Sequence, residues 1–106
     1  MIIAKFCFGE NGAQAGFTVS GHSGSAPAGE DIVCAAVSSA AYMAANTVTE
    51  VLGLTPAICE RNGFLSLTLP KEQAKTALPI LKGLCLHMEG LSEQYPEFIQ
   101  FERGAL

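Results

Sequence analysis

A cysteine and a histidine, the residue pair used in thiol-based acyl transfer, lie twelve residues apart in the N-terminal third of the chain. His22 and Cys34 both fall in residues 21–41, which read GHSGSAPAGEDIVCAAVSSAA. An imidazole within hydrogen-bond reach of a thiol favours the thiolate–imidazolium pair, in which the sulfur is nucleophilic. The imidazolium can protonate a leaving amine, and the neutral ring can then activate water. The pair therefore predicts nucleophilic chemistry at Cys34, with His22 as the general acid/base.

Cys34 is expected in the first turn of a long helix. Asp31 is a suitable N-cap residue, which places Cys34 at the third helical position. The unpaired N–H groups and the positive dipole end of a helix favour negative charge at this point. These N–H groups, including that of Cys34, are expected to bind a developing oxyanion. Ser38 lies one turn further along the same helix face, so its hydroxyl is expected in or near the site.

The segment that joins the histidine to the helix is rich in small residues. Gly21, Gly24 and Gly29 allow backbone conformations that other residues avoid, so the chain can fold back and bring His22 to the helix start. A purely structural interpretation stays open, because a first-turn cysteine is often part of a core and a loop histidine often lies on the surface. Residues 21–24 also fit the bare G-x-x-G pattern of an RNA-binding clamp, but basic residues do not flank them.

The hydrophobic pattern predicts the element order ββαββαβ. Strands are expected at residues 2–9, 16–20, 57–61, 64–69 and 97–102, and helices at 31–52 and 71–91. Asn62-Gly63 predicts a two-residue hairpin, and Pro79 is expected to kink or split the second helix. Hairpin-linked strands beside two helices predict an α+β fold, a small two-layer sandwich with a largely antiparallel sheet and two helices.

Length and composition narrow the classes of protein further. The 106 residues fit a single domain, residues 1–106. Six Lys and Arg against ten Asp and Glu give a net charge of −4, which argues against direct nucleic-acid binding. The hydrophobic fraction of 49% suggests apolar surface for a partner such as a second copy of the chain. No secretory signal is visible, and the apolar run at 32–45 is too short and alanine-rich for a membrane span, so a cytoplasmic protein is expected.

The cysteines do not show the spacing of a metal site or of a disulfide framework. Cys7, Cys34, Cys59 and Cys85 are 27, 25 and 26 residues apart, whereas zinc sites are usually assembled from close ligand pairs. Cys85 and His87 would point about 200° apart on a helix. We therefore expect no metal and no cofactor, and we expect Cys7, Cys59 and Cys85 to be small buried side chains.

The 21–41 segment resembles the ribosomal-processing cysteine protease (Prp) family of small cytosolic bacterial proteins. The matching residues are Gly21-His22, Gly24, Gly29 and the run D-I-V-C-A-A-V-S at 31–38, and the likeness continues through the hairpin to Gln94-Tyr95-Pro96. The resemblance implies that Cys34 is the nucleophile and His22 the general acid/base. Asp31 matches as well, either as the helix cap or as a residue that orients the histidine. Ser25 stands where the family often has an aromatic residue, so local loop packing or substrate contact is expected to differ there.

The resemblance also implies a substrate and an assembly. Family members are homodimers with a small α/β sandwich fold, and they remove an N-terminal extension from a large-subunit ribosomal protein precursor, which supports ribosome assembly. The cleaved peptide carries aromatic residues near the scissile bond, so an apolar groove is expected. An extended peptide is expected to lie beside loop 22–30, which would close over it.

Two other functions remain open on the sequence. The first is a non-enzymatic ribosome-associated binding module that uses the glycine-rich 21–30 loop. The second is a thiol redox or acyl-transfer role for Cys34.

Overall fold

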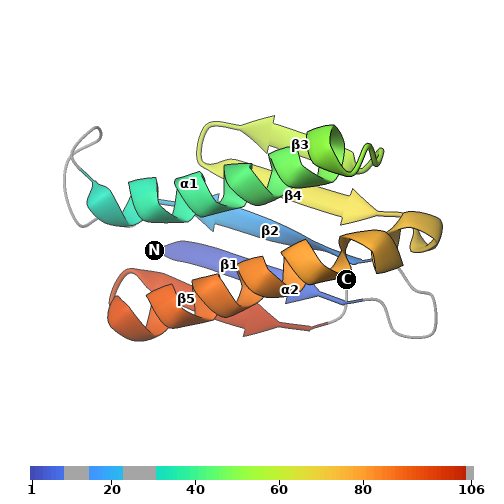
Figure 1. Ribbon diagram of the computed structural model, residues 1–106. Helices are drawn as coiled ribbons and strands as arrows, with labels where there is room; N and C mark the ends of the chain where they lie inside the picture. Colours follow the sequence, from blue (N-terminus) through green and yellow to red (C-terminus); the bar gives the residue numbers. More distant parts are fainter. Residues whose placement is uncertain (9–14, 23–30, 105–106) are drawn as a thin grey trace.

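A single mixed sheet carries both helices on one of its faces, as the computed structural model shows (Figure 1). The structure describes residues 1–8, 15–22 and 31–104. In chain order the elements are β1 (Ile2–Cys7), β2 (Ala15–Gly21), α1 (Ile32–Asn46), η1 (Thr47–Val51), β3 (Ala57–Arg61), β4 (Phe64–Leu69), α2 (Lys71–Gln94) and β5 (Ile99–Arg103). The predicted order ββαββαβ and the two-layer α+β sandwich are confirmed.

The strands lie in the order β3-β4-β2-β1-β5. The β1–β2, β2–β4 and β3–β4 pairs are antiparallel, and the β1–β5 pair is parallel. Each helix therefore joins two strands that run in the same direction, β2 to β3 through α1 and β4 to β5 through α2. Because such crossover connections are almost always right-handed, both helices cover the same face of the sheet.

The core lies between the sheet and this helical layer. Side chains of β4 alternate, with Leu65, Leu67 and Leu69 buried. They face the buried side of α1, which carries mostly small residues, and the buried side of α2, which carries larger ones. The largest fully buried side chains include Phe6, Phe17, Ile2, Leu67, Leu69, Leu81, Met88, Val37 and Val48. The small side chains on α1 allow that helix to lie close to the sheet.

Three details of the helices and strands differ from the prediction or refine it. The first helix has the predicted extent, but its last turn, η1, is wound as a π-helix. Pro79 does not split α2, which is one helix from Lys71 to Gln94. Strand β5 begins two residues later than predicted, because the Tyr95 carbonyl accepts hydrogen bonds from the Phe98 and Ile99 N–H groups and so closes a turn before the strand.

Two predictions about burial and length also need correction. Cys7 and Cys85 are buried as expected, but Cys59 is exposed because β3 is an edge strand whose residues are all exposed. α1 and η1 together form a continuous helix from Ile32 to Val51, which is longer than the apolar run at 32–45. Its length and its mean hydropathy of 1.4 are those of a membrane-spanning helix. One side of this helix is buried against the sheet and α2, so the core also explains its apolar composition.

Candidate active site

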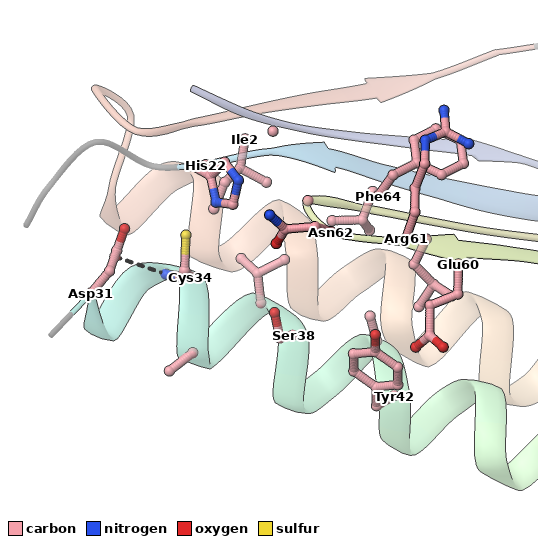
Figure 2. A pocket seen from close by; sticks show the side chains of 17 residues that line it. Ile2, His22, Asp31, Cys34, Ser38, Tyr42, Glu60, Arg61, Asn62 and Phe64 are labelled. Atoms are coloured by element: carbon pink, nitrogen blue, oxygen red, sulfur yellow. Dashed lines mark hydrogen bonds between the residues drawn. The ribbon is translucent and has the colours of Figure 1, made fainter. Parts of the chain in front are cut away.

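A groove of about 970 Å³ lies between α1 and the β3–β4 hairpin (Figure 2). Its lining includes all four residues singled out from the sequence, which are His22, Asp31, Cys34 and Ser38. The structure therefore brings together side chains from the end of β2 and from the first turns of α1. The predicted loop 22–30, with Gly24, Ser25 and Gly29, lies outside the described residues except for His22.

Asp31 holds the first turn of α1 in place. It is the N-cap, with extended backbone (φ −81°, ψ 98°), and its Oδ1 accepts a hydrogen bond from the Cys34 N–H at 2.9 Å. Asp31 is therefore the helix cap, one of its two predicted roles. The same bond corrects the expectation that the Cys34 N–H is available to an oxyanion, because the carboxylate already occupies that donor.

Cys34 is half-buried and its sulfur is directed out of the helix into the groove. Figure 2 shows the sulfur pointing from α1 toward the strand side of the groove, where the His22 ring lies. The preceding residue, Val33, does not line the groove and is buried in the core, while the buried Val37 lies one turn further along and forms part of the groove wall. The helix thus presents the thiol to the groove because its opposite side is fixed in the core.

His22 is held by backbone contacts at the end of β2. Gly21 has φ +91°, and a Cβ there would lie 2.3 Å from the Met1 carbonyl oxygen, so only glycine fits. The Gly21 N–H donates to the Gly63 carbonyl at 2.8 Å, and the Met1 nitrogen donates to the His22 carbonyl. The imidazole itself packs against Gly63, the turn residue of the β3–β4 hairpin. The β3–β4 hairpin therefore fixes the position of the His22 imidazole at the groove.

Residues one turn apart on α1 continue the groove away from the thiol. Ser38 and Tyr42 follow Cys34 at four-residue spacing, and all three line the groove. Across from them, Glu60 and Asn62 line it from the hairpin. The groove is therefore long enough for several residues of an extended chain.

Three of these lining residues were not predicted as site residues from the sequence: Tyr42, Glu60 and Asn62. A hydrogen bond to the Glu60 carboxylate raises the pKa of the Tyr42 hydroxyl above 10.0, and desolvation and the Glu60 charge act in the same direction. Figure 2 shows the Asn62 amide reaching from the hairpin toward Cys34 and His22. The helical spacing from Cys34 could have indicated Tyr42, whereas the two hairpin residues required the pairing of β2 with β4.

The described residues 1–8, 15–22 and 31–104 hold no group of three or more His, Cys, Asp or Glu side chains that could bind a metal ion together. The groove instead offers a thiol, an imidazole and an amide, which suit attack on a carbonyl and proton transfer.

Comparisons with known proteins point to one family. The family model described as cysteine protease Prp matches residues 1–100. The ribosomal processing protease Prp of S. aureus, solved with a covalently linked product peptide, has a TM-score of 0.85 at 21% identity, covering 98% of this chain and 100% of that one. The same protease with a substrate peptide has a TM-score of 0.81 at 20% identity, with the same coverage. A Streptococcus mutans protein has a TM-score of 0.72 at 26% identity, covering 100% of this chain and 96% of that one. No curated protein matches the sequence at a significant level.

Proposed function

This chain belongs to the cysteine protease Prp family, and on that premise we propose that it removes the N-terminal extension of a large-subunit ribosomal protein precursor, in support of ribosome assembly. The observation that carries the proposal is the shared groove, into which Cys34 from a capped helix start and His22 from the end of β2 both project. The peptide complexes of the S. aureus protease, which has the same fold, support a peptide as the substrate.

The proposed reaction proceeds through an acyl-enzyme. The Cys34 sulfur attacks the scissile carbonyl carbon while His22 accepts the thiol proton, and a tetrahedral oxyanion forms. The C–N bond then breaks as the imidazolium donates its proton to the leaving amine, which leaves a thioester on Cys34. Water attacks the thioester with His22 as the base, and the peptide acid departs as the sulfur regains its proton. These steps use only the thiol, the imidazole and water.

The oxyanion needs a hydrogen-bond donor other than the Cys34 N–H, because Asp31 occupies that group. We assign the Asn62 side-chain amide to this role. It lines the groove and is directed toward the nucleophile (Figure 2). A preoriented amide of this kind stabilises the charge that develops on the carbonyl oxygen. Ser38 then lies beside the bound peptide, one turn along α1.

We further propose that two copies of the chain associate through the outer surface of the helical layer, in the cytoplasm. Ile32 and Met43 lie on the same side of α1 and are 70% and 54% exposed. A second, shallow groove between α1 and α2 is lined by Met43 and by Ile80 and Leu84 of α2. An apolar surface of this kind is more often covered by a partner than left in water.

The test is incubation with the host's own precursor ribosomal protein, followed by intact-mass analysis. The wild type should trim the precursor, Cys34→Ala should not, and His22→Ala should slow acylation by roughly 10² to 10⁴. Cys59→Ala is the matched control, since it removes an exposed thiol outside the groove. A peptidyl thioester trapped on Cys34 would exclude a redox role. Trimming by Cys34→Ala at the normal rate would refute the cysteine-protease mechanism, and a wild type that does not trim the precursor would leave the ribosome-associated binding module.

A further inference from the structure

Tyr42 and Glu60 form the part of the groove most distant along α1 from the nucleophile. Tyr42 is eight residues after Cys34, or about 12 Å along the helix axis at a rise of roughly 1.5 Å per residue. An extended peptide covers about 3.3 Å per residue. A chain lying along α1 with its scissile bond at Cys34 therefore places its third or fourth residue from that bond beside Tyr42.

The charge at this position is negative. Side chains alternate along β3, so Glu60 points to the opposite side from its neighbours, and Figure 2 shows its carboxylate directed at Tyr42. The adjacent cation does not face it, because the Arg61 guanidinium stacks over the Phe64 ring at 4.1 Å and donates to Cys59 Sγ at 3.3 Å. Arg61 also lines the groove, but its guanidinium is engaged by Phe64 and Cys59, whereas the Glu60 carboxylate is directed at the Tyr42 phenol.

The chemistry of this pair fits a cation. A carboxylate accepts charge-assisted hydrogen bonds from an ammonium or guanidinium, and an exposed tyrosine ring attracts the same groups over its face. Tyr42 is 42% exposed, so part of its ring is open to a ligand. The Glu60 carboxylate is directed at Tyr42 and raises the pKa of its hydroxyl.

We propose that Tyr42 and Glu60 form a specificity subsite for a lysine or arginine side chain that lies three or four residues from the scissile bond. The proposal rests on the proposed peptidase function and adds a charge preference to it. A carboxylate-bearing residue at the same substrate position would be rejected, because it would meet Glu60 across the groove.

The test uses a set of peptides that share the precursor's cleavage sequence and carry a single lysine at successive positions on either side of the scissile bond. On the wild-type enzyme, lysine at the third or fourth position of one side should raise kcat/KM by roughly fivefold over leucine, mainly through KM, and glutamate should lower it. The gain should fall as the salt concentration rises.

Variants then assign the effect to the pair. Glu60→Gln keeps an acceptor for Tyr42 and should remove the lysine preference, and Glu60→Lys should reverse it in favour of glutamate. Glu93→Lys, an exposed charge reversal on α2 outside the groove, is the control and should leave the preference unchanged. If the peptides are cut at equal rates whatever their charge, or if the preference survives in Glu60→Gln, the subsite is refuted. Absence of cleavage of every peptide would instead refute the proposed function.

Discussion

The imidazole of His22 packs against the backbone of Gly63, so closely that a Cβ at Gly63 would lie 2.8 Å from Nε2. Gly63 has φ +72° in the β3–β4 turn, and its carbonyl accepts the Gly21 N–H. The two residues are far apart in the sequence, but the pairing of β2 with β4 places one above the other. The general acid/base that we propose is therefore positioned by the same β3–β4 turn that carries Asn62, the proposed oxyanion donor.

Gly63→Ala should reduce activity far more than its effect on stability explains. The new methyl group must displace the ring, and a misplacement of about 1 Å can cost roughly 10²-fold in rate. Gly53→Ala is the matched control, because Gly53 has a similar φ of +67° but nothing within 4 Å of its Cβ position. Both variants should lose about 1–2 kcal/mol of unfolding free energy, but only Gly63→Ala should lose peptidase activity. Equal activity in Gly63→Ala and Gly53→Ala would show that the packing contact with Gly63 does not position His22.

Asn62→Asp tests the assigned oxyanion donor. Aspartate is accepted in two-residue hairpin turns as readily as asparagine, so the fold should be kept, but the amide donor is lost. We expect kcat to fall by roughly 10² to 10³ with little change in KM. Steady-state kinetics on a peptide substrate, with circular dichroism to verify the fold, provide the measurement. A kcat within about twofold of the wild type would assign the oxyanion to another donor.

Asp31→Ala should destabilise the protein by about 1 kcal/mol, since it removes the side-chain cap of α1. Asp31→Asn retains a capping oxygen and should keep most of that stability. Urea unfolding of both variants measures the difference. If both variants lost stability equally, the charge of Asp31 rather than its hydrogen bond to Cys34 would stabilise the helix start.

The titration of Tyr42 reports its contact with Glu60. In a Tyr95→Phe background Tyr42 is the only tyrosine, so ultraviolet absorbance follows its ionisation alone. Because the hydrogen bond to Glu60 is the largest cause of the raised pKa, Glu60→Gln should lower the midpoint toward 10.0. The raised pKa also means that this contact stabilises the fold below pH 10.0 and that its contribution is lost as the pH rises through the folded-state pKa. An unchanged midpoint in Glu60→Gln would contradict the contact.

Met43→Glu should convert the proposed dimer to a monomer, because it places a charge in the apolar surface between α1 and α2. Val51→Glu alters an equally apolar, exposed residue outside that groove and should leave the assembly intact. Sedimentation velocity distinguishes the two states. A wild type that is monomeric at micromolar concentration would refute the interface.

Local signals predicted most of the fold and the position of Cys34. The Asn62-Gly63 turn, the alternation of β4 and the Asp31 cap each depend on residues close in sequence, and each is where the pattern indicated. The parallel β1–β5 pair and the exposure of Cys59 depend on which strands lie at the sheet edges, and no local pattern specifies that. The packing of His22 on Gly63 and the meeting of Tyr42 with Glu60 depend on the same long-range pairing, so the sequence indicated neither.

The first helix carries the groove residue Cys34 directly after the core residue Val33, and the buried side chains of Val37 and Ala41 form both core and groove wall beside Ser38 and Tyr42. A rotation of this helix by one residue would turn the sulfur by about 100°. The direction of the Cys34 sulfur is thus fixed by how the valines and alanines of α1 pack against the sheet. A core truncation outside the groove, such as Val33→Ala, would loosen that fit, so enzymatic rate should be lost on warming before the fold melts.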